Sequence, residues 1–246
     1  LAWQLLALSP EGATSLGIDK DSHAGLRSQL EDRSAAGVAR KIVTLRDALK
    51  QLDRIAVPGL DYATQTSLSV VRSAFNTALD GLTLPYGDAT IGGWRNTPYV
   101  VIQNVGAYLD TPRFLDSDHP VRDAADAEAY LARLTAYPGQ LDGELGRMKS
   151  AAAAGLVPPS FLLDKAIRQM ELAIADARGG GGLVSSLVQR TKNIPGDWER
   201  RARAVATGPV VAALERQLAE LKSQRARATD QAGLWARPHG DEWYAW

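Results

Sequence analysis

The apolar positions of this 246-residue chain recur at helical spacing along most of its length. From Leu26 to Ile55 they follow intervals of three, four and seven, with Arg, Lys and Asp mostly on the other faces. This pattern predicts one long amphipathic helix that ends before Pro58. Further helices are predicted over residues 62–79, 98–110, 123–137, 140–154, 160–178, 183–192, 197–207 and 211–221, with a kink or break at 208–209.

Proline and glycine separate these predicted helices. Pro138-Gly139 and Pro158-Pro159 are expected to break the chain between neighbouring helices, and Asp61 or Thr64 is expected to cap the helix that starts near residue 62. Residues 82–96 hold many turn-forming residues without a sustained period, which predicts a long shaped loop. Four consecutive glycines at 179–182 have the greatest backbone freedom in the chain, so a flexible hinge is expected there.

The fold class follows from the same pattern. The Val and Ile clusters lie inside helical periods, so no segment reads as a strand. We therefore expect an all-α fold, an antiparallel multi-helix bundle with long shaped loops, in which residues 1–246 form a single helical domain. Because the sequence starts at Leu1 and ends at Trp246 inside what reads as a new helix, we expect it to be part of a longer protein.

Composition narrows the possible partners. The 28 Lys and Arg residues balance 28 Asp and Glu residues, so the chain lacks the basic excess of a nucleic-acid-binding protein, and we expect no nucleic-acid partner. Cysteine is absent, which excludes disulfides and thiolate metal sites. No apolar run approaches the roughly 20 residues that a membrane-spanning helix needs, so we expect no membrane span.

The sequence carries no complete catalytic or metal-binding motif. Its histidines, His23, His119 and His239, stand in turn-like settings and none precedes Glu, so a helix-borne zinc motif is absent. The aspartates around His119 are more typical of helix caps and turns than of metal ligands. The glycine cluster lacks the Lys-Ser/Thr of a phosphate loop, and no serine elbow occurs. We predict neither a catalytic residue nor a metal site in this chain.

Aromatic residues gather among Gly and Pro near the C-terminal end and in the loop at residues 94–96. Trp and Tyr in such loops can line a cleft, because each combines a large apolar face with a polar group. The alternative is a loop anchored into the core by Trp235, with Asp241 capping the next helix. The candidate cleft residues are Trp94, Arg95, Trp235, Arg237, His239 and Tyr244.

Several of these segments resemble one bacterial family. Residues 9–17, 123–134 and 155–159, and above all Gly233-Leu234-Trp235 with Pro238-x-Gly240 and Tyr244, resemble the N-terminal half of "domain of unknown function 885" proteins. That resemblance implies an all-helical fold similar to the carboxypeptidase Taq zinc metallopeptidases. It also implies that the suspected zinc motif lies in a C-terminal half of the protein, beyond these 246 residues.

Two function hypotheses follow. By the resemblance, the chain is the N-terminal helical half of a zinc-dependent peptidase or related hydrolase: it forms one wall of the substrate cleft and is inactive alone. Its partners would be the C-terminal catalytic half, which holds the zinc, and a peptide substrate. The alternative is a non-catalytic helical interaction protein that offers the stripe from Val211 to Leu221, or an aromatic loop, to a partner. The family resemblance favours the bacterial cell envelope or periplasm over the cytoplasm.

Overall fold

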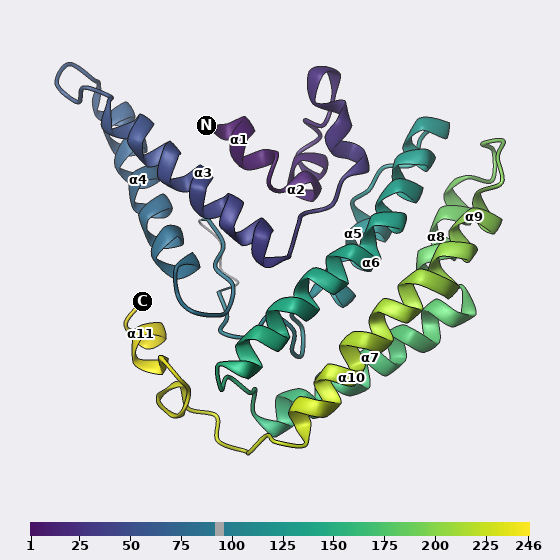
Figure 1. Cartoon of the computed structure of the whole chain (residues 1–246). Coiled ribbons are helices and arrows are strands. Elements are labelled where there is room, and N and C mark those ends of the chain that lie inside the picture. The colour runs from purple at the N-terminus through teal and green to yellow at the C-terminus, as the bar shows by residue number, and fades with distance from the viewer. Residues whose placement is uncertain (92–95) are drawn as a thin grey trace.

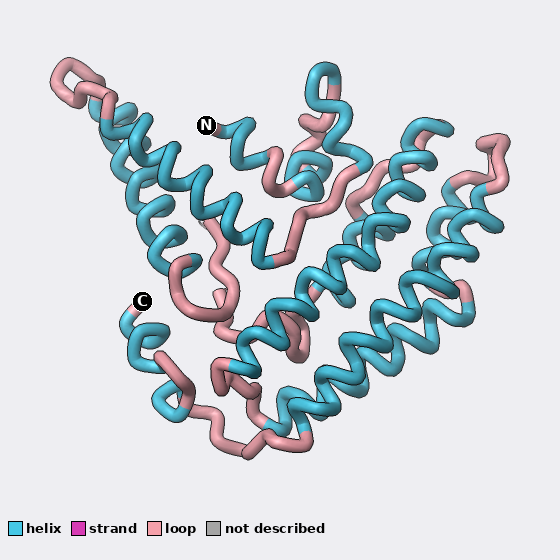
Figure 2. The backbone as a smooth tube through the Cα atoms, in the orientation of Figure 1, coloured by secondary structure: helices cyan, strands magenta, loops and turns pink. Residues whose placement is uncertain are grey.

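The computed structural model describes residues 1–91 and 96–246, which form helices and loops without a β-strand (Figures 1 and 2). The predicted all-α class is therefore confirmed. The helices are α1 (Ala2–Leu6), α2 (Pro10–Ser15), η1 (Asp21–Ser28), α3 (Ala35–Asp53), α4 (Tyr62–Leu82), α5 (Ala107–Ser117), α6 (Ala124–Ala153), α7 (Ser160–Gly179), α8 (Gly182–Arg190), α9 (Trp198–Val205), η2 (Ala206–Val210), α10 (Val211–Arg225), η3 (Leu234–Ala236) and α11 (Gly240–Ala245).

The long helix α6 is central to the main bundle. Helix α10 packs along α6 and along α7, and α7 runs antiparallel to α6 and α10 (Figure 1). On α7 the buried positions are Leu163, Ala166, Met170 and Ile174, at intervals of three and four. The apolar stripe read from the sequence is therefore the face that is buried between helices. Helices α5, α8 and α9 pack at one end of this bundle.

Helices α3 and α4 form a hairpin with a small core of its own. Leu45, Leu52 and Phe75 fill the space between the two helices. The N-cap prediction for α4 is confirmed, because a carboxylate oxygen of Asp61 accepts a hydrogen bond from the Thr64 amide at 2.8 Å. In Figure 1 the hairpin and the main bundle form the two arms of a V, with the N-terminal helices between them.

Residues 231–246, here called the C-terminal strap, lead from the end of α10 to the hairpin (Figure 1). The Trp243 ring is buried and stacks on Tyr86, with 5.9 Å between ring centroids. The Trp246 indole N–H donates a hydrogen bond to the Thr77 carbonyl of α4 at 2.8 Å. The strap therefore ties the base of the hairpin to the last helix of the bundle.

The first predicted long helix is wrong over its N-terminal part. Residues 29–34 are irregular, and α3 begins only at Ala35. The Gln29 carbonyl accepts a hydrogen bond from Arg133 at 2.8 Å, and the Leu26 carbonyl accepts one from Arg133 at 3.0 Å besides the bond from the Gln29 amide that ends η1. A distant side chain thus replaces the helical hydrogen bonds that the apolar period predicted.

The prediction of a helix over residues 98–110 is also wrong. Thr97 exchanges two backbone hydrogen bonds with Asp88, at 2.8 and 3.1 Å, which holds this stretch beside the preceding loop. Helix α5 starts only after Gly106, whose φ of +131° is outside the helical region and suits glycine. The predicted end of this helix at residue 110 is wrong as well, because α5 continues through Pro112 to Ser117.

Two predicted breaks are helical in the structure. Helix α6 continues through Pro138-Gly139, which joins the segments predicted as 123–137 and 140–154 into one helix of 30 residues. At Gly208-Pro209 the chain makes a π-helical turn, η2, between α9 and α10. A proline inside a helix costs about 3 kcal/mol, and packing of α10 against both α6 and α7 offsets that cost.

The tetraglycine forms the tight turn between α7 and α8. Gly180 has a φ of +69°, which favours glycine, and the Gly181 amide donates a hydrogen bond to the Asp176 carbonyl at 2.9 Å. The Asp176 carboxylate accepts from the Gly182 amide at 3.0 Å. Flexibility of this turn, and the single domain over residues 1–246, stay predictions. Within the described residues, no helix has the length and apolar character needed to cross a membrane.

Candidate functional site

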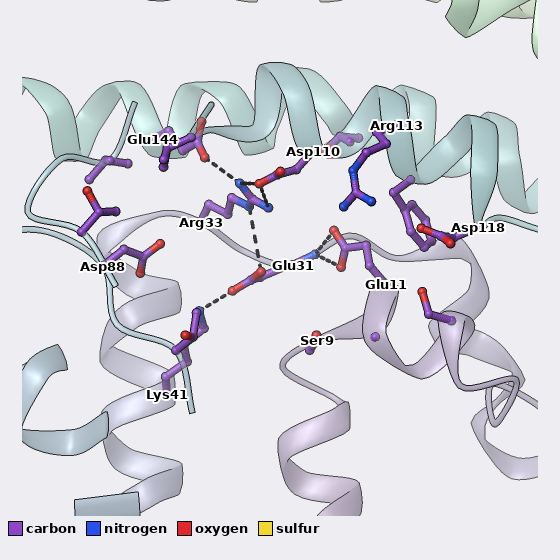
Figure 3. A pocket seen from close by; sticks show the side chains of 18 residues that line it. Ser9, Glu11, Glu31, Arg33, Lys41, Asp88, Asp110, Arg113, Asp118 and Glu144 are labelled. Atoms are coloured by element: carbon purple, nitrogen blue, oxygen red, sulfur yellow. Dashed lines mark hydrogen bonds and ion pairs between the residues drawn. The ribbon is translucent and has the colours of Figure 1, made fainter. Parts of the chain in front are cut away.

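A charged cavity of about 390 Å³ lies where α2, α3, α5, α6 and the loop before α5 meet (Figure 3). Apolar groups of Phe114, Val100 and Val105 form part of its wall. The described lining holds twice as many acidic as basic side chains. They are Glu11, Glu31, Asp88, Asp110, Asp118 and Glu144 against Arg33, Lys41 and Arg113.

Arg33 reaches the cavity because its backbone passes close to α6. A Cβ atom at Gly143 would lie 2.9 Å from the Ser34 amide nitrogen and 3.2 Å from the Arg33 carbonyl carbon, so a side chain at Gly143 would push the segment away. The missing side chain at Gly143 therefore allows the Arg33 guanidinium to reach the α6 carboxylate of Glu144.

The guanidinium of Arg33 joins three carboxylates. It lies 2.9 Å from Glu144, 3.2 Å from Asp110 and 3.9 Å from Glu31. Burial disfavours the charged form, yet the negative charges of Glu144, Glu31 and Asp110 hold the pKa of Arg33 above its ordinary value. Lys41 of α3 pairs with Glu31 on the other side. Most of the charge on one side of the cavity is therefore compensated within a single network (Figure 3).

Glu11 is bonded differently from these paired carboxylates. Its oxygens accept hydrogen bonds from the Glu31 amide at 2.9 Å and from the Gln140 side chain at 3.2 Å, which are both neutral donors. It forms no ion pair with a described residue. Burial, and next the negative charge of Glu31, raise the pKa of Glu11. Glu11 is thus a partly buried carboxylate that faces a cavity without a basic partner.

A second polar network holds the helix that carries Glu11. Arg133 of α6 is fully buried and donates to the Thr14 hydroxyl of α2 at 2.7 Å. It also donates to Nδ1 of His119 at 2.8 Å, so the imidazole proton lies on Nε2, 3.0 Å from the Asp126 carbonyl. Burial lowers the pKa of Arg133 to about 10. This network, here called the Arg133 network, fixes α2 against α6 and so sets one wall of the cavity.

The sequence match defines the family. Residues 10–246 match the model of the family described as "Bacterial protein of unknown function (DUF885)". The chain belongs to this family. The resemblance stated from the sequence is therefore confirmed at the level of the family, and the protein belongs to a bacterial family.

One solved structure shares the fold of this DUF885 chain. "The crystal structure of the putative lipoprotein from Colwellia psychrerythraea" matches it with a TM-score of 0.86 at 18% sequence identity. The match covers 98% of this chain and 42% of that chain, so the chain spans less than half the length of its structural neighbour. At 18% identity the match shows a shared fold and carries no information about function. No curated protein matches the sequence, and the similarity to carboxypeptidase Taq stays a prediction.

The C-terminal cleft candidates of this DUF885 chain lie in the strap, not around the cavity. Trp235 and Tyr244 are 73% and 84% exposed. Arg237 donates to the Gln231 carbonyl, and Nδ1 of His239 lies 2.8 Å from a Glu242 carboxylate oxygen. A cleft role for these four residues stays a prediction. The alternative of a Trp235 anchor is wrong, because the buried anchor is Trp243.

Trp94 and Arg95, the other two candidates, fall outside the described residues. Sequence reasoning missed Glu11, Arg33 and Glu144. Glu144 did leave a signal, because it stands three residues after Leu141 and four before Met148, on the buried stripe of α6. A carboxylate at such a position requires a buried partner, so its presence indicates a charged group nearby.

The histidines of the described part do not fit a zinc site. His23 stacks on Trp3 with ring centroids 3.6 Å apart, His119 belongs to the Arg133 network, and His239 contacts Glu242. Within residues 1–91 and 96–246, no group of three or more His, Asp or Glu side chains is arranged to hold a metal ion. Asp123 instead caps α6, accepting from the Asp126 amide at 2.9 Å.

Proposed function

We propose that this chain forms one helical wall of the substrate cleft in a longer hydrolase, a zinc-dependent peptidase, and supplies binding groups instead of the metal. The observation that carries the proposal is the cavity, into which α2, α3, α5, α6 and the loop before α5 direct charged side chains. A hollow with a few convergent polar groups and an apolar wall is typical of a small-molecule or peptide site.

The remainder of the protein would supply the chemistry. The structural neighbour is more than twice as long as the part that matches this chain, which is compatible with a second, catalytic part. Zinc ligands would have to come from that part, because the histidines described above do not fit a metal. The residues of this chain would orient the substrate: Arg33 and Lys41 through hydrogen bonds, and Phe114 through apolar contact.

The test starts with the full-length protein from its native source. We expect an intact mass well above 26.4 kDa, about one zinc ion per chain and hydrolysis of short peptides, whereas residues 1–246 alone should be inactive. Lys41→Met should lower kcat/KM by about tenfold, because the substrate would lose its contact with the charged side chain of Lys41. Lys149→Met, which changes an exposed lysine of α6 that does not line the cavity, is the control. A full-length protein without zinc that cleaves no peptide would overturn the proposal.

The interaction protein is the second candidate. The stripe from Val211 to Leu221 does not supply its surface, because Val211, Leu214 and Leu221 are buried. Val43 of α3 and Tyr62 and Val70 of α4 are large apolar side chains exposed on the hairpin, and we propose the hairpin as the surface that another protein would cover. The test uses a complex of this protein with a partner, isolated from the native source, and the variant Val70→Asp. If the variant does not form the complex, and the protein neither holds zinc nor cleaves peptides, this second function replaces the first.

We propose the cell envelope as the location. The structural neighbour is described as a "putative lipoprotein", and the family is bacterial. Fractionation of the producing bacterium should recover the protein with periplasmic or membrane-associated markers. Recovery with cytoplasmic markers alone would exclude this location without affecting the proposed cleft.

A further inference from the structure

Among the described residues that line the cavity, the half-buried carboxylate of Glu11 forms no direct ion pair. Glu31, Asp110 and Glu144 all contact Arg33. Asp88 lies 3.4 Å from Arg147, which approaches from the neighbouring turn of α6. The described hydrogen bonds to Glu11 come from neutral donors, and the positive charges of Arg33 and Arg133 act on it only through space.

A shielded carboxylate without a counter-ion is unfavourable, because it loses hydration without gaining an opposite charge. Proteins usually neutralise such a group with a basic side chain or protonate it, unless a ligand supplies the charge. Arg113 lines the same cavity and points into it in Figure 3, yet it forms no ion pair with Glu11 in the described structure. The cavity therefore combines an excess of acidic side chains in its described lining, one of them a carboxylate without a direct ion pair, with enough volume for a ligand group.

We propose that this cavity binds a primary ammonium group at the carboxylate of Glu11, with the chain attached to that ammonium lying against Phe114 and Val100. The ammonium has three N–H donors and one positive charge, which match a carboxylate whose other contacts are neutral. Two apolar side chains beside the carboxylate suit a ligand with a hydrocarbon part.

An ammonium of this kind has two natural sources in peptides: the α-amino end and a lysine side chain. If the proposed function holds, the inference names the substrate class, namely peptides held by an ammonium group. This part rests on the proposed function, whereas ammonium binding itself does not. Arg113, which lines the same cavity, would repel an ammonium ligand through its own positive charge.

Calorimetric titration of the full-length protein tests the proposal with three probes. Leucine amide carries an α-ammonium group, N-acetyl-leucine amide has the same side chain without a charge, and cadaverine resembles a lysine side chain. We expect leucine amide or cadaverine to bind at least tenfold more tightly than N-acetyl-leucine amide. The probe that binds more tightly identifies the source of the ammonium group.

Two variants with opposite expected effects make the test specific. Glu11→Gln keeps an oxygen acceptor for the Glu31 amide and should weaken ammonium binding about tenfold. Arg113→Gln removes the repelling cation and should strengthen it severalfold. Glu171→Gln, which alters an exposed carboxylate of α7 outside the cavity, should leave binding unchanged. Unfolding curves check that each variant is folded.

The outcomes separate this inference from the proposed function. Equal binding of charged and acetylated probes, or unchanged binding in Glu11→Gln, overturns the ammonium site even if the protein hydrolyses peptides. Ammonium binding that depends on Glu11 in a protein without peptidase activity supports the site and counts against the proposed function. Weaker binding in Arg113→Gln would show that Arg113 holds the ligand, which also overturns the assignment.

Discussion

Two buried arginines of this protein stand in contrasting surroundings. Arg133 is surrounded by neutral acceptors, namely backbone carbonyls, the Thr14 hydroxyl and the imidazole of His119. Arg33 is surrounded by carboxylates and borders an open cavity. Burial accordingly lowers the pKa of Arg133 to about 10, whereas the acidic neighbours hold the pKa of Arg33 above its ordinary value.

The difference separates a structural network from a candidate binding site. In the Arg133 network each donor meets an acceptor inside the protein, and the arginine has no exposed surface. In the described lining around Arg33 the acids outnumber the bases, and the described hydrogen bonds to Glu11 come from neutral donors. A network whose donors and acceptors are all paired is not stabilised further by a ligand. A carboxylate beside a cavity that lacks a direct ion pair is stabilised when a ligand brings a positive charge.

The largest expected effect is on the Arg133 network. Arg133→Met should lower the free energy of unfolding by about 3–5 kcal/mol, because several buried carbonyls and His119 lose their donor together. Chemical denaturation measures the change. Arg201→Met, which breaks an exposed pair with Glu128, is the matched control and should change stability little. Equal effects of the two substitutions would mean that the buried network stabilises the fold no more than an exposed ion pair does.

His119 should make the same network sensitive to pH. Burial lowers the pKa of His119 to about 4, and the nearby charges of Arg133 and Arg190 add to the shift. The unfolded chain takes up a proton near the ordinary pKa while the folded chain does not, so stability should fall as the pH drops from about 6.5 to 4. The expected loss is about 3 kcal/mol, at 1.36 kcal/mol per pKa unit. The backbone carbonyl of Asp126, which accepts from Nε2, favours the protonated imidazole and offsets part of this downward shift of the pKa.

Comparison with His119→Gln isolates this contribution. Glutamine can accept from Arg133 and donate to Asp126, but it does not titrate. The difference in unfolding free energy between wild type and variant should therefore vary with pH between 4 and 6.5. A difference that stays constant over this range would contradict the assigned pKa shift.

Glu11→Gln should behave in the opposite way to Arg133→Met. Since the pKa of Glu11 is raised, the folded state holds a proton more tightly than the unfolded state, and ionisation above the folded pKa reduces stability. Removing the charge should therefore leave stability unchanged at pH 7 or raise it by up to about 1 kcal/mol. Thermal unfolding at pH 7 is the measurement. A loss larger than about 1 kcal/mol would make Glu11 a structural residue like Arg133.

The smallest effect is expected at the exposed aromatic residues of the strap. Trp235→Ala and Tyr244→Ala should each change the unfolding free energy by less than about 0.5 kcal/mol, because both side chains are mostly in solvent. Trp243→Ala, at a buried position in the same strap, should cost about 3 kcal/mol. Guanidinium titrations of the three variants give the comparison. A large loss at Trp235 or Tyr244 would mean that these rings support the fold.

Part of the helical architecture could be predicted from the sequence because it depends on local chemistry. The helix beginning at Tyr62 follows from its Asp61 cap, and α7 follows from Pro158-Pro159 ahead of a regular apolar stripe. Local rules failed at Pro138, where α6 continues because contacts with α10 outweigh one lost hydrogen bond. They failed again before Ala35, where Arg133 binds the backbone carbonyls.

The sequence by itself determined the all-α class, the family and several caps, since these depend on periodicity and on residues close together in the chain. The tertiary structure decided the cavity. Glu11, Arg33, Asp110 and Glu144 are far apart in sequence, and no local period relates them. Their charges matter only because α2, α3, α5 and α6 bring them into one partly shielded volume, where electrostatic interactions are stronger than in water.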